Sequence, residues 1–257
     1  MGPGWFWVLL MPGEKLSSEE LARYDRQLPL FGIGGQAKLK NVSVLIAGVG
    51  GLGSFEAMYL AALGVGRLVL VDADYVDITN LNRQVLYWTE DIGKPKPYPA
   101  AEKLRRLNPN VEVVVVRERI TPETASRLVK DVDVVIDGLD NWETRLILDE
   151  AAYRAGKPYI HAGVYGFQGQ VVVVVPGETP CLRCLLPPFL RTPERIIAIS
   201  PVVGIVAGIV VMELVKLVTG IGRSNKGRMI IVDTYNMEFM NVELKPRKGC
   251  MCPEPGV

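Results

Sequence analysis

The sequence predicts an α/β protein with a Rossmann-like, mostly parallel sheet, helices on both faces, and an extension of antiparallel C-terminal strands. Between Val42 and Gly163, short runs rich in Val and Ile alternate with helix-like segments. Such near-continuous apolar runs are typical of strands that are buried on both faces of a parallel sheet. Beyond Gly163 the strand-like runs lengthen and are joined by turns rather than by helices, which favours antiparallel pairing.

The expected elements follow in order along the chain. Ser17 or Ser18 can cap a short helix through Glu20, and Glu19 adds negative charge to its first turn. Parallel strands are expected at 42–47, 67–72, 111–116, 132–138 and 158–163. Helices are expected from Gly51 and at 100–107, 122–130 and 142–155, with a buried apolar helix at 201–212. Antiparallel strands are expected at 169–175, 229–235 and 237–245.

Length and composition limit the class of protein. The chain has 257 residues, with no linker rich in Gly, Ser or Pro and no internal repeat, so we expect one domain over 17–257. Residues 1–16 are expected to be a poorly ordered extension, unless translation starts at Met11. The apolar run 5–11 is too short to span a bilayer and lacks the basic start of a secretion signal. A net charge of +1 gives no electrostatic case for nucleic acid or an anionic membrane. We therefore expect a cytoplasmic protein.

A glycine-rich motif between the first strand and the first long helix predicts a nucleotide site. In GVGGLG, Gly48 permits a tight turn, Gly50 lets the backbone approach a phosphate, and Gly53 allows close packing of helix and strand. A helix that begins near Gly51 directs its N-terminal amides at the same anion. Asp72 follows at the end of the next strand, where an acid can hold a ribose hydroxyl.

Further polar residues are expected at the same edge of the sheet, because ligands of open parallel sheets bind at the carboxyl ends of the strands. Asp140 ends such a strand, and a carboxylate there suits Mg²⁺. Arg26, Arg83 and Lys96 are expected to neutralise charge during transfer at phosphorus. Other candidates for nucleotide binding are Asp74, Asn80 and Asn141. Taken singly, several of these residues could be helix caps or solvated charges, but their succession favours one site.

The motifs RYDRQ, GVGGLG, DADYVDITNLNRQ, GKPK and DNWETR resemble those of the ThiF/MoeB/ubiquitin-activating family, and most closely its molybdopterin-synthase adenylyltransferase branch. The resemblance implies an enzyme that uses ATP to adenylate the C-terminal glycine carboxylate of a ubiquitin-fold carrier ending in Gly-Gly, with release of pyrophosphate. The implied roles are ribose binding by Asp72, phosphate binding by Asn80, Arg83 and Lys96, Mg²⁺ binding by Asp140, and contact of Arg26 with the nucleotide of the partner subunit in a homodimer.

The four cysteines form two close pairs, CLRC (Cys181, Cys184) and CMC (Cys250, Cys252). Four thiolates can hold Zn²⁺ tetrahedrally, and the resemblance implies a structural zinc here. The alternative is disulfide bonding, which occurs inside cells of hyperthermophiles. Many relatives carry a further cysteine at a place that falls near Pro193, whereas this chain has none between Cys184 and Cys250. We therefore expect the reaction to stop at the acyl adenylate, with sulfur supplied by a separate protein.

Other functions remain open on the sequence alone. His161, the only histidine, is expected to be buried and structural rather than catalytic. One alternative is an ATP-dependent enzyme acting on tRNA, like the threonylcarbamoyladenosine dehydratases, although the balanced charge disfavours RNA. NAD-dependent oxidoreduction leaves Arg83, Lys96 and Asp140 unexplained. An inactive subunit of a heterodimeric activating enzyme would not need these charged residues. The sequence does not identify the carrier or the pathway.

Overall fold

An eight-stranded mixed sheet forms the centre of the protein, as the computed structural model shows for residues 16–186, 194–249 and 252–254. The strand order is β3-β2-β1-β4-β5-β6-β7-β8. The first five strands pair in parallel, and β6, β7 and β8 extend the sheet by antiparallel pairing. The bounds are β1 Ser43–Ala47, β2 Arg67–Val71, β3 Glu112–Val116, β4 Val134–Asp137, β5 Tyr159–Tyr165, β6 Gln168–Val174, β7 Arg228–Asp233 and β8 Glu238–Glu243. The predicted fold class is confirmed.

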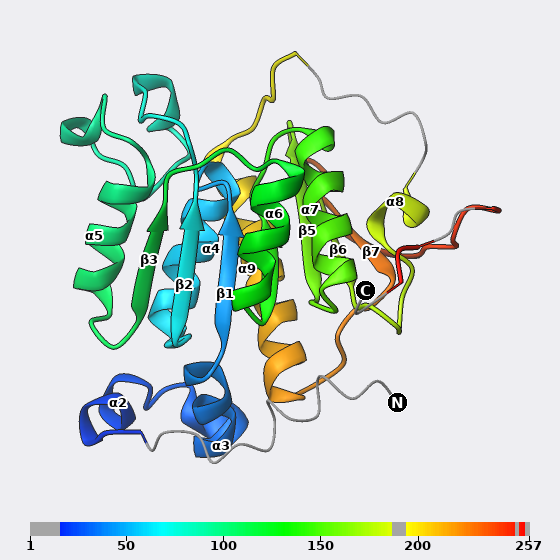
Figure 1. The fold of residues 1–257 in the computed structure, drawn as a ribbon. Coiled ribbons are helices and arrows are strands. Elements are labelled where there is room, and N and C mark those ends of the chain that lie inside the picture. The colour runs from blue at the N-terminus through cyan, green and yellow to red at the C-terminus, as the bar shows by residue number, and fades with distance from the viewer. Residues whose placement is uncertain (1–15, 187–193, 250–251, 255–257) are drawn as a thin grey trace.

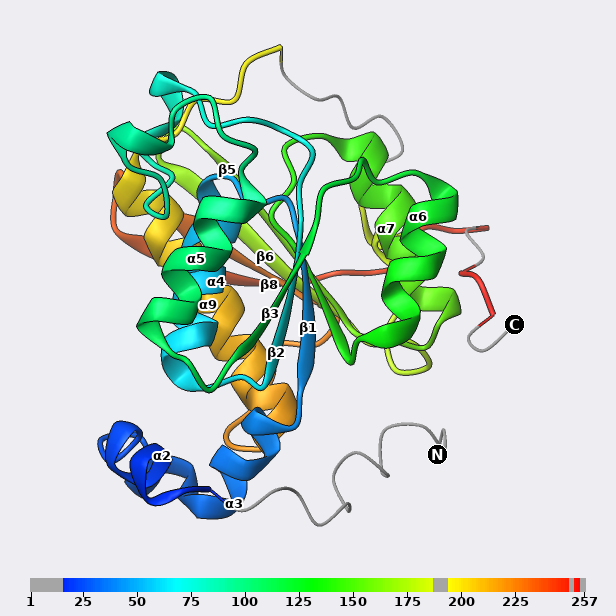
Figure 2. The ribbon, with the colours of Figure 1, turned by 60° about the vertical axis from the view of Figure 1, so that its left-hand side comes forward.

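Helices cover both faces of the parallel strands (Figures 1 and 2). One face carries α4 (Gly51–Leu63), α5 (Pro97–Leu107) and α9 (Ser200–Thr219). The other carries α6 (Pro122–Leu128) and α7 (Trp142–Arg154), with α8 (Leu182–Leu185) packed against α7. A separate apolar cluster fills each interface between helices and sheet. This burial on both faces explains why the parallel strands read as unbroken Val and Ile runs.

The parallel strands end level with one another, which concentrates polar residues at one edge. Ala47 at the end of β1 pairs with Val71 of β2 and with Asp137 of β4. The next residues along the chain, such as Gly48 and Asp72, therefore leave the sheet at the same edge. The strand order reverses between β1 and β4, and ligands of open α/β sheets bind at such a switch point.

Two helices lie below the opposite edge of the sheet, α2 (Ser18–Arg23) and α3 (Leu28–Lys40) (Figure 1). Ser17 is the cap: its hydroxyl accepts from the Glu20 amide at 3.1 Å, and the Glu20 carboxylate accepts from the Ser17 amide at 2.7 Å. The sequence did not predict α3, because its glycines weaken the helical pattern and Gly32, with φ of +70°, interrupts it. The expected N-terminal extension falls almost entirely outside the described residues.

Two helices differ from the predicted bounds. α5 begins at Pro97 rather than at residue 100, since the first helical turn has no need of the amide protons that Pro97 and Pro99 lack. These prolines therefore lie in the first turn of the helix. α9 extends past residue 212 because Glu213 is satisfied inside the protein: it accepts from Lys216 Nζ at 2.7 Å and from the Asn225 amide at 2.7 Å.

By length and composition α9 is the single described helix that could cross a membrane, with a mean hydropathy of 2.3 over its most apolar window. It lies against α4, α3 and strands β5 and β6. Its Val-rich face is buried against these elements. This is the arrangement of a core helix.

One buried acid in α4 has no obvious structural role. Glu56 is 0% exposed, and neither carboxyl oxygen has a hydrogen-bond partner among the described residues. Burial, and secondarily the charge of Asp137, raises the pKa of Glu56 well above its ordinary value, against the opposing influence of Arg145. Leaving polar atoms buried without partners costs about 1–3 kcal/mol.

We expect Glu56→Met to raise the free energy of unfolding by about 1–3 kcal/mol at neutral pH. Because the pKa of Glu56 is higher in the folded than in the unfolded protein, the proton-linked part of the wild-type penalty is absent below the unfolded pKa and grows as pH rises towards the folded pKa. Urea unfolding at pH 5 and pH 8 should therefore show a larger gain at the higher pH. The exposed Glu102→Met in α5 is the control and should change stability by less than about 0.5 kcal/mol. A destabilised Glu56→Met protein would contradict this account.

Candidate active site

A cavity of about 400 Å³ opens at the carboxyl edge of the parallel strands. Nine of the candidate residues line it, namely Gly48, Gly50, Gly51, Asp72, Asp74, Arg83, Lys96, Asp140 and Asn141. Gly53, Asn80 and Arg26 are not among its lining residues. The structure thus brings together groups from five separate segments that the sequence linked only by their order.

The glycine loop forms the floor of the cavity. Gly48 has φ of +83°, a conformation that favours glycine, and it turns the chain from β1 into α4. A Cβ at Gly53 would lie 1.9 Å from the Gly48 carbonyl oxygen, so a side chain there is excluded by helix–strand packing. At Gly50 the nearest heavy atom to a Cβ would be Gln84 Nε2, 3.7 Å away. The backbone at Gly50 and the start of α4 at Gly51 are therefore open to a ligand phosphate.

Asp72 is held by two backbone amides. Its carboxylate oxygens accept from Val49 N and from Asp74 N, both at 2.8 Å. Burial raises the pKa of Asp72, and the nearby Lys96 charge opposes this shift. A carboxylate has about four acceptor positions, so two remain for the hydroxyls of a ribose.

Lys96 is only 7% exposed and lies 3.4 Å from the Asp74 carboxylate. The chain from 73 to 96 folds back on itself to bring it there: Val76 N donates to Lys94 O at 2.9 Å, and Lys96 N donates to Asp74 O at 2.9 Å. A buried cation close to the glycine loop is placed to bind phosphate oxygens.

A second ion-pair cluster holds the outer part of this loop. Asp91 is buried and accepts from the Trp88 amide at 3.0 Å and from Lys94 at 3.1 Å, and it also pairs with Lys103 of α5. The Lys103 ammonium also lies 4.2 Å from the centre of a Trp88 ring. This cluster, which was not predicted from the sequence, fixes the loop that carries Lys96.

In the polar segment that follows Asp72, some side chains line the cavity and others hold the backbone of the segment. Arg83 lines the cavity while its Nη1 donates to Thr79 O at 2.9 Å. Asn80 instead serves the backbone, since its Oδ1 accepts from the Asp77 amide at 3.0 Å. Gln84, which was not a candidate for binding, lines the cavity, and its buried Oε1 has no hydrogen-bond partner among the described residues. A ligand donor would satisfy that oxygen.

Asp140 and Asn141 have different roles after β4. Asn141 is the N-cap of α7, where its Oδ1 accepts from the Thr144 amide at 2.9 Å. Asp140 is exposed at the cavity and makes one weak contact, accepting from Asn141 Nδ2 at 3.3 Å. The helix cap is therefore Asn141, and the Asp140 carboxylate is available to a cation bound with the ligand.

Arg26 lies far from this cavity in the same chain. It is exposed in the turn between α2 and α3, below the opposite edge of the sheet (Figure 1). Among the residues that the structure describes, Arg26 makes no hydrogen bond or ion pair. A contact between Arg26 and a nucleotide therefore requires the cavity of another subunit.

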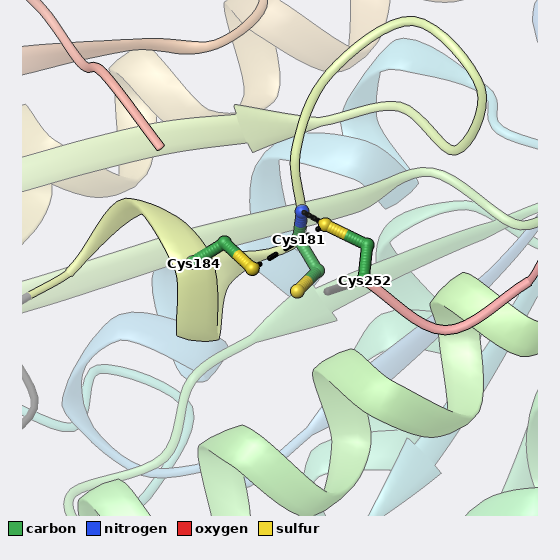
Figure 3. A group of neighbouring side chains, drawn as sticks. All are labelled: Cys181, Cys184 and Cys252. Atoms are coloured by element: carbon green, nitrogen blue, oxygen red, sulfur yellow. Dashed lines mark hydrogen bonds between the residues drawn. The ribbon is translucent and has the colours of Figure 1, made fainter. Parts of the chain in front are cut away.

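Three of the four cysteines gather beside α7. The sulfur atoms of Cys181, Cys184 and Cys252 lie within 4.8 Å of one another (Figure 3). The Cys252 sulfur accepts from the Cys181 amide at 3.1 Å. Such spacing and donor chemistry fit a thiolate-bound zinc ion. However, Cys184 takes part in a disulfide whereas Cys181 and Cys252 are free thiols, and Cys250 lies outside the described residues.

Asp149 of α7, which the sequence did not identify, anchors the first cysteine pair. It is 1% exposed and accepts from the amides of Leu182 and Arg183 at 3.1 and 3.4 Å. Burial, only partly opposed by these bonds, raises the pKa of Asp149 to about 7. The carboxylate thereby fixes the α8 turn between the two cysteines.

Comparison with known proteins agrees with this geometry. Residues 24–253 match the model of the ThiF family. A sulfur carrier protein adenylyltransferase from Thermus thermophilus is 39% identical, over 93% of this chain and 92% of its own length. The adenylyltransferase and sulfurtransferase MOCS3 of Sus scrofa is 42% identical over 93% of this chain, which spans only 54% of that protein.

Solved structures share the fold. The crystal structure of PaaA has a TM-score of 0.79 and 30% identity, covering 91% of this chain and 76% of its own. The structure of E. coli MccB with ATP has a TM-score of 0.80 at 24% identity, covering 90% of this chain and 74% of its own, and shows likeness of fold alone. The glycine loop, the strand-end acid, the buried lysine and the extent of these matches show that the chain belongs to the ThiF family.

Proposed function

We propose that this chain is an ATP-dependent adenylyltransferase that activates the C-terminal glycine carboxylate of a small ubiquitin-fold sulfur carrier, of the MoaD or ThiS kind. Its relatives are named adenylyltransferases, and the chain is accordingly a nucleotidyltransferase. The observation that carries the proposal is the convergence of Asp72, Lys96 and Asp140 on one cavity above the glycine loop.

The reaction forms one bond and breaks another at the α-phosphorus of ATP. A carrier carboxylate oxygen attacks this phosphorus, and the bond to the bridging oxygen of pyrophosphate breaks, leaving a carboxyl–AMP anhydride. Asp72 would hold the ribose, while the α4 amides, Arg83 and Lys96 would hold phosphate oxygens. Mg²⁺ bound at Asp140 would supply positive charge to the departing pyrophosphate. Catalysis of this kind is mostly positioning and charge stabilisation.

The charges around the cavity support a need for additional cations. Its lining contains four acidic side chains and four basic ones, namely Asp72, Asp74, Glu118 and Asp140 against Arg83, Lys96, Arg119 and Arg145. A balanced lining does not neutralise a triphosphate on its own. Mg²⁺ and Arg26 of a second subunit would both add positive charge, which favours a homodimer in which each chain completes the site of the other.

The remaining features of the proposal concern organisation. We propose that residues 17–257 form one adenylating domain in a cytoplasmic protein. With the Cys184 disulfide reduced, Cys181, Cys184, Cys250 and Cys252 would hold zinc as a structural ion. The chain itself would carry no thioester cysteine, so a separate sulfur donor would act on the carrier adenylate. The position near Pro193, at which many family members have a further cysteine, lies outside the described residues.

Pyrophosphate–ATP exchange tests the function. With a Gly-Gly-ending carrier present, wild-type protein should incorporate labelled pyrophosphate into ATP, and Asp140→Ala should reduce this exchange by at least about 100-fold. Asp131→Ala is the matched control, because Asp131 is exposed before β4 at the opposite end of the same strand. Its exchange should equal that of wild type. Exchange that survives Asp140→Ala would remove the metal role, and no exchange with any such carrier would refute the proposed reaction.

Thiol counting together with metal analysis distinguishes zinc from disulfide bonding. For a four-thiolate site, protein purified without chelator or reductant should contain about one zinc per chain. Alkylation after denaturation with chelator should then modify all four cysteines, and Cys252→Ser should lower the zinc content. A zinc-free protein with only two reactive thiols would establish the disulfide instead.

Absence of a covalent carrier intermediate is tested on a non-reducing gel. Incubation with ATP and a carrier should yield no enzyme–carrier band that dithiothreitol removes, because zinc-bound sulfurs are not free nucleophiles. Cys→Ser variants are unsuitable as controls because each would remove a proposed zinc ligand, so the same incubation without ATP is the control. An ATP-dependent, reducible adduct in wild type would overturn this part of the proposal.

A further inference from the structure

A cluster of fully buried polar side chains lies behind the cavity, around Asp137 at the end of β4. This carboxylate is 0% exposed. It accepts from His161 Nδ1 at 2.7 Å and from the Tyr159 hydroxyl at 2.9 Å, both of which come from β5. Its other partners are the Leu139 amide at 2.9 Å and Arg145 Nε, 3.3 Å from Oδ2. Asp137 is thus a saturated acceptor with one cationic partner.

Arg145, from α7, is the member of the cluster that reaches the cavity wall. Its Nε faces Asp137, and its Nη2 donates to Ala162 O at 3.0 Å and also to Leu139 O. Its guanidinium also lies 5.0 Å from the centre of the Trp142 ring. Among the described residues no hydrogen bond comes from Nη1. The two N–H groups of Nη1 are therefore what Arg145 can offer to a ligand.

The charges in this cluster are defined by burial. Desolvation lowers the pKa of His161, against the influence of Asp137, so the ring is neutral at pH 7. Although burial acts to raise the pKa of Asp137, Arg145 and His161 outweigh it, and the net shift is downward. Gln170 Nε2 lies 3.1 Å from His161 Nε2, so the amide donates to that nitrogen and the ring proton is on Nδ1, facing Asp137.

We propose that Tyr159 and His161 are positioning residues that act through Asp137 to aim Arg145 Nη1 at a phosphate oxygen of the bound nucleotide. The inference rests on the proposed function. It assigns a role to His161, the only histidine of the chain, which does not line the cavity. A guanidinium held on three sides cannot turn away from its ligand, and such preorganised donors stabilise developing charge at little reorganisation cost. Without the Tyr159 hydroxyl or the His161 imidazole, the Asp137 carboxylate would still pair with Arg145 but could change its orientation.

Steady-state exchange kinetics test this role through matched variants. Tyr159→Phe and His161→Leu should each lower kcat for pyrophosphate exchange by about 10-fold or more, because each removes one hydrogen bond that orients Arg145 through Asp137. Their KM for ATP should change by less than about threefold, because the other binding groups remain. His161→Asn keeps a donor at the position of Nδ1 and should recover most of the activity. Tyr153→Phe removes a buried α7 hydroxyl that donates to Thr179 O, and should leave exchange unchanged.

A double-mutant cycle separates positioning from general destabilisation. Arg145→Lys keeps the charge but loses the fork, so His161→Leu added to it should cost less than about threefold more. A purely structural histidine would cost as much on this background as in wild type, which would overturn the proposal. Unchanged exchange in both Tyr159→Phe and His161→Leu would also overturn it.

The single histidine provides an independent readout that does not need turnover. In untagged protein labelled with ¹⁵N-histidine, ATP should shift the His161 ring nitrogen signals, and Arg145→Lys should abolish this shift while ATP still binds. A shift without exchange in wild type would retain the positioning role and refute the proposed function. Exchange without a shift would support the proposed function and refute the positioning role. If neither exchange nor a shift occurs, the proposed function and the positioning role are both refuted.

Discussion

The close approach of three backbone segments at Gly48 is the constraint on which the site depends. A Cβ at Gly53 would meet the Gly48 carbonyl oxygen at 1.9 Å, and one at Gly138 would meet it at 2.6 Å. Only glycine at these positions lets α4 begin directly on β1 while the chain leaving β4 passes beside it. The start of α4, Asp72 and Asp140 share one cavity because this junction is tight. A side chain at Gly53 or Gly138 would push these elements apart, and the amides at the start of α4 would separate from the Asp140 carboxylate.

The parallel part of the fold could be predicted because its signal is local and repeated. Each strand buried on two faces must be apolar throughout, and each helix between two such strands must follow within a short distance. The predicted helices are wrong where the position of a residue in the fold decides whether it can be helical. Pro97 breaks a helix in its interior yet begins one at its first turn, and sequence alone does not say which applies. α3 has an interrupted pattern at Gly32, and it packs against α9, which is distant in the sequence.

The residues of the candidate site also differ in whether local sequence could identify them. Asp72 was identifiable because a strand end and a glycine loop fix its place. Asn80 has a side chain suited to binding a phosphate, but its Oδ1 accepts a hydrogen bond from the Asp77 amide instead. Asp137 was hidden inside an apolar strand, and its partner His161 is 24 residues away in the chain. Pairing of β4 with β5 places these two side by side. Such long-range juxtaposition has no short sequence signature, and only the sheet register reveals it.

The buried cluster also changes how the cavity must be regarded electrostatically. Arg145 counts as a cation in the lining, but its charge is already balanced by Asp137 beneath it, whereas burial raises the pKa of the nearby Glu56 well above its ordinary value. Arg145 thus contributes directed N–H groups more than net charge. With that cation discounted, the acids of the lining outnumber the remaining bases, and a triphosphate would meet a site of its own sign. Binding then depends on positive charge that arrives from outside the chain's own cavity. Under the proposed function, a metal-bound nucleotide and a second subunit would both bring such charge, so the site would favour a metal-bound nucleotide in a dimer over a free anion.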